Sequence, residues 1–205
     1  LYSSAIGASV TFIFLFILFG AFLAKSGMGK LFNDLAMALA GHKQGGPAKV
    51  AVISSGFMGS INGTAVANVV GTGSFTIPLM KKIGYHKNFA GAVEASASVG
   101  GQILPPVMGA SAFIMAETTG VSYGTIALAA TLPALLYYLG VMAQVHFRAG
   151  KDNLKGVPKA DLPRVKDVLK ERGHLLIPIV ALVFFLFQSI PVSYAAVYTI
   201  VLTVI

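Results

Sequence analysis

The sequence predicts an all-α integral membrane protein that crosses the bilayer several times, and three observations support this fold class. Apolar residues make up 56% of the chain, charged residues only 11%, and the mean hydropathy is +0.79. Soluble domains carry about 25% charged residues. A polar, glycine-containing stretch at residues 57–65 and a Gly-Gly-Gln-Ile-Leu-Pro-Pro run at residues 100–106 each interrupt apolar sequence. These interruptions predict a re-entrant helical hairpin and a discontinuous transmembrane helix.

The first part of the chain predicts a membrane-spanning helix followed by an interfacial helix. Residues 4–24 are uncharged and rich in phenylalanine, and a crossing needs roughly 20 such residues. Residues 31–40 place their leucines and Phe32 on one helical face, with Asn33 and Asp34 off it. We expect this short amphipathic helix to lie along the membrane surface.

Residues 50–80 predict a hairpin that enters the membrane and returns to the face from which it came. The first limb, residues 50–59, has about half of the roughly 20 residues that a crossing needs, and the second limb is expected to end at Pro78. The alternative is a single kinked helix that crosses the membrane. Non-helical backbone at mid-depth costs several kcal/mol per unsatisfied group unless protein or a watery cavity surrounds it. The turn at residues 57–65 therefore suggests a binding site.

Residues 88–118 are too long for one straight crossing and predict two half-helices, at 89–99 and 107–117. Between them, paired glycines weaken a helix, and Pro105 and Pro106 remove backbone donors and clash with the preceding turn. We expect an unwound joint at mid-depth.

The rest of the chain predicts a crossing at residues 125–147, a basic cytoplasmic connector at 148–174, a crossing at 175–190 and the start of a last helix. We therefore expect three parts: a scaffold helix with the interfacial helix (1–45), half of a transport domain (46–123), and the crossing helix, connector and next helices (124–205). The chain starts at Leu1 and its last apolar run is cut off at Ile205, so we expect a fragment of a larger permease.

The basic residues favour the hairpin over the single kinked helix. All 15 lysines and arginines fall on one side of the membrane if the hairpin returns to its starting face, whereas a single crossing would separate Lys49 from Lys81. Because basic loops are typical of the cytoplasmic side, we expect that side for all of them. Membrane orientation thus explains the net charge of +8, and no nucleic-acid partner is expected.

Both interruptions expose backbone carbonyl and amide groups inside the membrane, which predicts a binding site where they meet. The hairpin tip and the joint supply these candidates: Ser60, Asn62, Gly63, Thr64, Gly100, Gly101, Gln102, Pro105 and Pro106. An uncharged set of oxygens suits a hard monovalent cation such as Na⁺ and does not suit zinc, which prefers nitrogen and sulfur. We expect the Na⁺ ligands to come from Ser60, Asn62, Gly63 and Gly101, and we expect no other cofactor.

Glu94 is an acidic residue inside a predicted half-helix, and intramembrane carboxylates are functional candidates. Two roles are open for it. It relays a proton or pairs across the transport domain, or it reaches water or a lysine of the nearby basic loop.

Enzyme motifs are not found. No histidine lies near a serine at mid-membrane depth, which argues against an intramembrane serine protease. Gly71-x-Gly73 lacks the further glycine and the lysine of nucleotide-binding loops.

Four stretches resemble the large membrane subunit of tripartite ATP-independent periplasmic (TRAP) transporters. They are Asn-Gly-Thr-Ala-Val-Ala-Asn-Val-Val at 62–70, Gly-Ser-Phe-Thr-Ile-Pro-Leu-Met-Lys at 73–81, Gly-Ala-Val-Glu-Ala at 91–95 and Gly-Gln-Ile-Leu-Pro-Pro-Val-Met-Gly-Ala at 101–110. The sequences of these motifs are most similar to those of the TAXI-type fused permeases (DctM-like). The specific resemblance covers about residues 50–140. Family members often carry Ser-Gly-Ser where this chain has Ile61-Asn62-Gly63.

The resemblance implies one half of an inverted-repeat elevator transporter in a bacterial or archaeal inner membrane. It also implies symport of a small organic acid, usually with sodium, from a periplasmic binding protein of the TAXI type. A small membrane subunit, or a fused equivalent, is a further implied partner. By the same resemblance, the hairpin tip and the joint form one sodium site and one wall of the substrate site.

Three functions follow from these observations. The first is the transmembrane subunit of a binding-protein-dependent, ion-driven importer of small organic acids. The second is a stand-alone proton-coupled carboxylate transporter in which Glu94 is central. The third is a non-transporting membrane scaffold or an intramembrane enzyme, which leaves the polar hairpin tip without a purpose.

Overall fold

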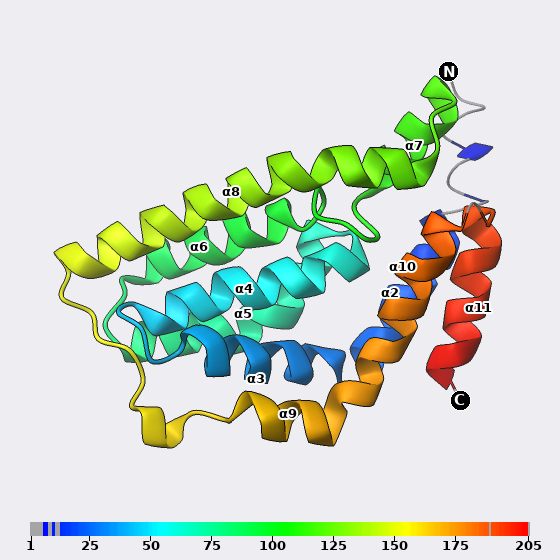
Figure 1. Cartoon of the computed structure of the whole chain (residues 1–205). Coiled ribbons are helices and arrows are strands. Elements are labelled where there is room, and N and C mark those ends of the chain that lie inside the picture. The colour runs from blue at the N-terminus through cyan, green and yellow to red at the C-terminus, as the bar shows by residue number, and fades with distance from the viewer. Residues whose placement is uncertain (1–5, 8–9, 11–12, 189, 205) are drawn as a thin grey trace.

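The computed structural model describes residues 6–7, 10, 13–188 and 190–204, and within these residues the regular structure is entirely helical (Figure 1). The α-helices considered below are α2 (Phe14–Lys25), α3 (Met28–Ala40), α4 (Gly46–Asn62), α5 (Ala65–Lys82), α6 (Lys87–Gly100), α7 (Ala110–Thr119), α8 (Tyr123–Lys151), α9 (Val165–Arg172), α10 (Ile177–Phe187) and α11 (Val192–Val204). Two 3₁₀ turns, Lys159–Asp161 and Gly173–Leu176, lie in the connection from α8 to α10.

Among the described helices, α8 alone is long and apolar enough to cross a membrane by itself. Helices α2 and α3 meet the same test only together, and they are bent by 67° at the break between them. Gly27, which precedes α3, has a φ of 96°, a conformation that glycine adopts without a steric penalty. The helix predicted at residues 4–24 lies partly outside the described residues, and the predicted amphipathic helix is present as α3.

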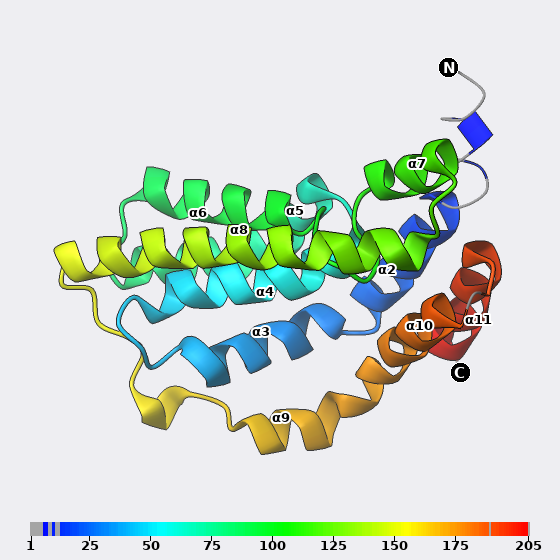
Figure 2. The ribbon, with the colours of Figure 1, turned by 45° about the horizontal axis from the view of Figure 1, so that its top comes forward.

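Helices α4, α5, α6 and α8 lie side by side as a bundle in both views (Figures 1 and 2). Ala48 at the start of α4 shares an apolar cluster with Met80 near the end of α5, Ala90 near the start of α6 and Ala149 near the end of α8. The hairpin of α4 and α5 therefore returns to the end of the bundle from which it starts.

The hairpin limbs are longer than predicted, and the break between them is shorter. The sequence predicts a first limb at residues 50–59, but α4 has 17 residues and continues through Gly59 and Ser60. The helix ends where Gly63 takes a left-handed conformation, with φ 64°, and donates its N–H to the Gly59 carbonyl at 3.1 Å. The polar residues before Gly63 thus remain helical, and only residues 63–64 form the turn.

The second limb also continues beyond its predicted end, since Pro78 lies inside α5 and the helix runs to Lys82. Proline removes one backbone donor, a loss that membrane helices tolerate where neighbouring groups satisfy the freed carbonyl. The discontinuous helix is present as α6 and α7, separated by a joint at residues 101–109 that is longer than predicted.

A second group of helices packs beside the bundle. Helix α2 lies against α10 and α11, and Phe16, Phe19, Leu182 and Ala195 share one apolar cluster there (Figure 1). The predicted connector is partly helical, because α8 extends to Lys151 and α9 covers Val165–Arg172. Helix α9 packs near α3. The division into scaffold and transport parts stays a prediction.

Candidate functional site

The hairpin and the joint meet through their backbones. A β-carbon built on Gly101 would lie 2.5 Å from the Gly59 Cα, and one built on Gly59 would lie 2.7 Å from the Gly101 Cα. Such distances exclude any side chain at either position, so only glycine permits this approach. The contact continues with a hydrogen bond from the Val107 N–H to the Ser60 carbonyl, 2.9 Å long. The structure therefore brings the two predicted interruptions together.

The end of α4 presents carbonyl oxygens with free hydrogen-bonding capacity. The Ile61, Asn62 and Gly63 carbonyls accept no hydrogen bond from any described residue. The Asn62 side-chain oxygen accepts from the Thr64 N–H at 3.2 Å. A helix C-terminus carries a partial negative charge, which favours a cation beside it.

A cavity of about 200 Å³ lies at the hairpin end. Asn62, Gly63 and Thr64 line it from the hairpin, Gln102 lines it from the joint, and Phe16 lines it from α2. Ala110, the first residue of α7, forms another part of the wall. The cavity thus combines the C-terminal end of one helix with the N-terminal end of another, whose dipole favours an anion.

Other predicted site residues lie at the contact rather than in this cavity. The Ser60 hydroxyl donates to the Phe57 carbonyl at 2.8 Å, and Ser60 is buried. Gly101 faces Gly59, and Gly100 packs against α8, where a β-carbon would lie 2.6 Å from a Tyr137 ring carbon.

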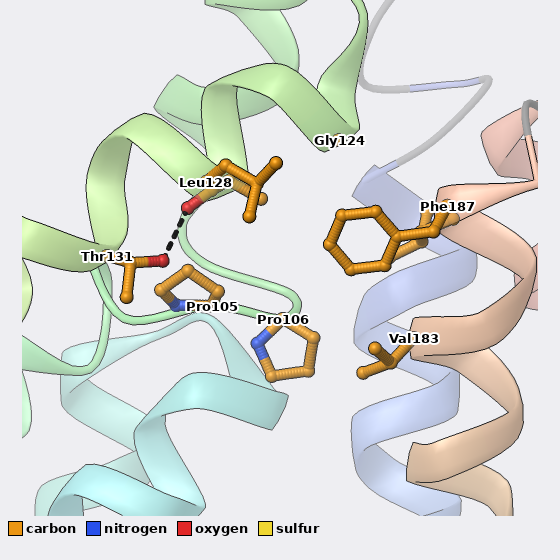
Figure 3. A pocket seen from close by; sticks show the side chains of 9 residues that line it. Pro105, Pro106, Gly124, Leu128, Thr131, Val183 and Phe187 are labelled. Atoms are coloured by element: carbon orange, nitrogen blue, oxygen red, sulfur yellow. Dashed lines mark hydrogen bonds between the residues drawn. The ribbon is translucent and has the colours of Figure 1, made fainter.

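Pro105 and Pro106 do not line the cavity at the hairpin tip. They line another pocket, of about 160 Å³, together with Leu128 and Thr131 of α8 and Phe187 of α10 (Figure 3). The Tyr123 hydroxyl donates to the Pro106 and Val107 carbonyls and so fixes the joint to the start of α8. The side chains around the two prolines in this pocket are mostly apolar. The one hydroxyl among these side chains, that of Thr131, donates to the Ala127 carbonyl at 3.0 Å.

Glu94 lies outside both pockets, inside the bundle and fully buried. Hydroxyl groups surround its carboxyl, and these come from Ser55 of α4 and from Thr72 and Thr76 of α5. Glu94 contacts no lysine among the described residues, and its side chain is not exposed at the surface. These hydroxyls are not among the predicted site residues, although Thr72 and Thr76 stand four residues apart on one face of α5, a detectable signal.

Comparison with known proteins identifies one family over the whole chain. Residues 1–205 match the family described as the tripartite ATP-independent periplasmic transporter, DctM component. The 2,3-diketo-L-gulonate TRAP transporter large permease protein YiaN of Escherichia coli is 29% identical over 73% of this chain and 35% of its own length. The C4-dicarboxylate TRAP transporter large permease protein DctM of Pseudomonas aeruginosa is 30% identical over 72% of this chain and 34% of its own.

A third relative has the same coverage pattern. The sialic acid TRAP transporter large permease protein SiaM of Vibrio cholerae is 28% identical over 80% of this chain and 38% of its own length. The chain therefore spans little more than a third of the curated relatives it matches.

Proposed function

Because the chain belongs to the DctM family, the large permease component of TRAP transporters and not an enzyme family, we propose that it is part of a secondary active importer of small organic acids. In this proposal the complete permease is a multi-pass protein of the bacterial inner membrane, and Na⁺ is the coupling ion. The chain contributes one half of an inverted-repeat elevator, and its partner half belongs to the complete permease.

The observation that carries this proposal is the meeting of the hairpin end with the joint at Gly59 and Gly101. Asn62 and Gly63, whose carbonyls accept no hydrogen bond from the described residues, line the same cavity as Gln102. Uncharged oxygens of this kind suit a hard cation, and helices interrupted at mid-membrane are typical of ion sites in secondary transporters.

The substrate class is proposed from chemistry and from the relatives. Their names specify diketo-L-gulonate, C4-dicarboxylate and sialic acid, all of which are organic acids. In this chain α7 begins at Ala110 in the wall of the same cavity, and an N-terminal helix end favours a carboxylate. We propose one wall of the substrate site there, beside the Na⁺.

The proposed partners are a periplasmic binding protein of the TAXI type and a small membrane subunit or its fused equivalent. The proposal of a TAXI-type partner rests on the amino-acid sequence of residues 62–110. The proposed cytoplasmic side is the end of the bundle where Lys49 lies 3.0 Å from His146 and where Arg148 lies over the Phe89 ring at 5.6 Å. Cytoplasmic loops of membrane proteins carry an excess of such basic residues.

Asn62→Ala tests the site in the complete transporter. Uptake into proteoliposomes, with the binding protein added, is measured at varied Na⁺ concentration. Loss of an oxygen beside the cation should raise the Na⁺ concentration for half-maximal uptake about tenfold, which corresponds to roughly 1.4 kcal/mol.

Asn88→Ala is the matched control, since Asn88 is exposed at the start of α6, and it should leave the Na⁺ dependence unchanged. Uptake by Asn62→Ala with an unaltered Na⁺ dependence would reject the site.

A further inference from the structure

The carboxyl group of Glu94 is the point at which three helices of the bundle meet. The Ser55 hydroxyl of α4 lies 2.6 Å from Oε1, the Thr72 hydroxyl of α5 contacts the same oxygen, and the Thr76 hydroxyl lies 2.5 Å from Oε2. Ser98, one turn along α6, is 3.4 Å from Oε1. Glu94, Ser55 and Ser98 are fully buried.

No cation compensates a charge at this carboxyl among the described residues, whose two ion pairs join Arg148 to Asp152 and Arg172 to Glu171. From α8, the Tyr138 hydroxyl faces the region but donates to the Ala97 carbonyl at 2.7 Å. The remaining titratable or charged groups on the packed helices are Lys49 at the start of α4, Lys81 and Lys82 at the end of α5, Lys87 on α6 itself, and Tyr123, Tyr137, His146, Arg148 and Lys151 on α8. Burying an unpaired charge is costly.

The hydroxyl groups around Glu94 have fewer protons to donate than contacts to fill, which favours a proton on the carboxyl group. The Ser55, Thr72 and Thr76 hydroxyls make three contacts with Glu94, one between Ser55 and Thr72, and two with backbone carbonyls, those of Asn68 and Thr72. Each hydroxyl has one proton to donate. A proton on Oε1 lets Thr72 donate to the Asn68 carbonyl while it accepts from Glu94.

The spacing of the oxygens favours a proton over a metal ion. The Ser55 hydroxyl lies 2.6 Å from Glu94 Oε1 and 2.8 Å from the Thr72 hydroxyl, which are the lengths of O–H···O hydrogen bonds. A hard cation at ~2.4 Å from each oxygen would hold neighbouring oxygens ~3.4 Å apart. The α5 backbone at Gly73 also packs closely against Glu94, because a β-carbon there would lie 3.0 Å from the Glu94 Cγ.

A route to this carboxyl begins in a cavity of about 400 Å³ between α3 and α5. Thr72, which contacts Glu94, lines this cavity, and Lys30, Asn33 and Asp34 of α3 line it as well. Burial raises the pKa of the Asp34 carboxyl above its usual range, against the opposing charges of Lys30 and Arg172. A cavity of this size with Lys30, Asn33 and Asp34 in its wall accommodates water molecules.

We propose that Glu94 is a proton-binding site, loaded from this cavity through the Thr72 hydroxyl. A hydronium ion in the cavity gives a proton to the Thr72 oxygen, Thr72 passes its own proton to Glu94 Oε1, and water remains. The protonated carboxyl then links α4, α5 and α6 through neutral hydrogen bonds. Coupling of this proton to import rests on the proposed function; binding of the proton does not.

Infrared spectroscopy of the complete permease in lipid nanodiscs tests the binding step without any transport. The wild type should show the C=O stretch of a buried carboxylic acid, and Glu94→Gln should lose that band. Glu117→Gln, at an exposed position near the end of α7, is the matched control and should keep it. A band that survives in Glu94→Gln, or a wild type without one from mildly acidic to mildly alkaline buffer, would overturn the proposal.

Thr76→Val serves if Glu94→Gln does not fold. It keeps the carboxyl but removes the hydroxyl at Oε2, so the C=O band should move to higher frequency. An unmoved band would place the proton elsewhere.

Uptake assays separate this inference from the proposed function. An inward proton gradient should stimulate uptake severalfold in the wild type and in Glu117→Gln but leave Glu94→Gln unaffected. Wild-type uptake that ignores the gradient would contradict proton coupling alone. No wild-type uptake of any organic acid would contradict the importer itself.

Discussion

At the scale of single residues, glycines decide where the backbones of this protein touch. Gly59 and Gly101 each stand where a β-carbon would fall within 2.7 Å of the other's backbone. Gly20 of α2 similarly faces Asn62, where a β-carbon would lie 3.1 Å from the Asn62 Cα. The candidate site is therefore shaped by missing side chains as much as by polar ones.

Gly59→Ala should destabilise the protein by about 2 kcal/mol, because the added methyl group meets backbone that cannot move aside. Thermal unfolding of the purified permease in detergent measures this effect. Gly91→Ala is the control, since nothing lies within 4 Å of the corresponding β-carbon on α6. It should be neutral or slightly stabilising, as alanine favours a helix over glycine. Equal unfolding temperatures for the two variants would contradict the tight contact.

At the scale of elements, α8 completes the broken helix. Two tyrosines of α8 donate to carbonyls near the end of α6, where helix carbonyls begin to lack partners along their own helix. The Tyr138 hydroxyl donates to the Ala97 carbonyl at 2.7 Å, and the Tyr137 hydroxyl donates to the Ser96 carbonyl at 2.8 Å. Tyr137 is the middle residue of α8, so the break in α6 lies halfway along the one described helix able to span a membrane alone.

Tyr138→Phe should lower the free energy of unfolding by about 1–2 kcal/mol, because it leaves a partly buried carbonyl without a donor. Tyr137→Phe removes an exposed hydrogen bond and should have a smaller effect. Chemical denaturation of the two variants side by side gives the comparison. A larger loss for Tyr137→Phe would mean that the α6 end is held differently.

At the scale of the whole molecule, the hairpin and the broken helix could be predicted from local signals, whereas the packing that brings Glu94 to the hydroxyls of α4 and α5 could not. Glycine and proline mark interruptions wherever they occur, so Gly63, Gly101 and Pro105 were informative without any partner. The length of α4 was missed because Gly59 and Ser60 look like turn residues until Gly63 is seen to cap the helix. Contacts of Glu94 join segments distant in the sequence.

The placement of the prolines shows the same limit. Pro105 and Pro106 were grouped with the hairpin tip because they adjoin Gln102 in the sequence, but the chain turns between them and the cavity. Proximity along a non-helical joint is a poor guide to which side of it a residue faces.

The membrane orientation of the hairpin stays a prediction, and it has a direct test. Single cysteines introduced into a cysteine-free complete permease test that orientation. Lys43→Cys and Lys82→Cys flank the hairpin at exposed positions, and both should react with a membrane-impermeant maleimide from the cytoplasmic side only. Thr119→Cys, exposed at the end of α7, should react from the opposite side. Labelling of Lys43→Cys and Lys82→Cys from different sides would show that the hairpin segment crosses the membrane.

Because the backbones touch directly at Gly59 and Gly101, the hairpin and the joint should move together as one rigid unit. Protein interiors have low compressibility and transmit strain, and a flexible side chain would otherwise absorb part of a push. A shift of α4 at its basic end, where Lys49 contacts His146, would therefore also move Val107, whose N–H donates to the Ser60 carbonyl near the other end of α4. The far wall of the cavity would then shift in step with the basic end of the bundle.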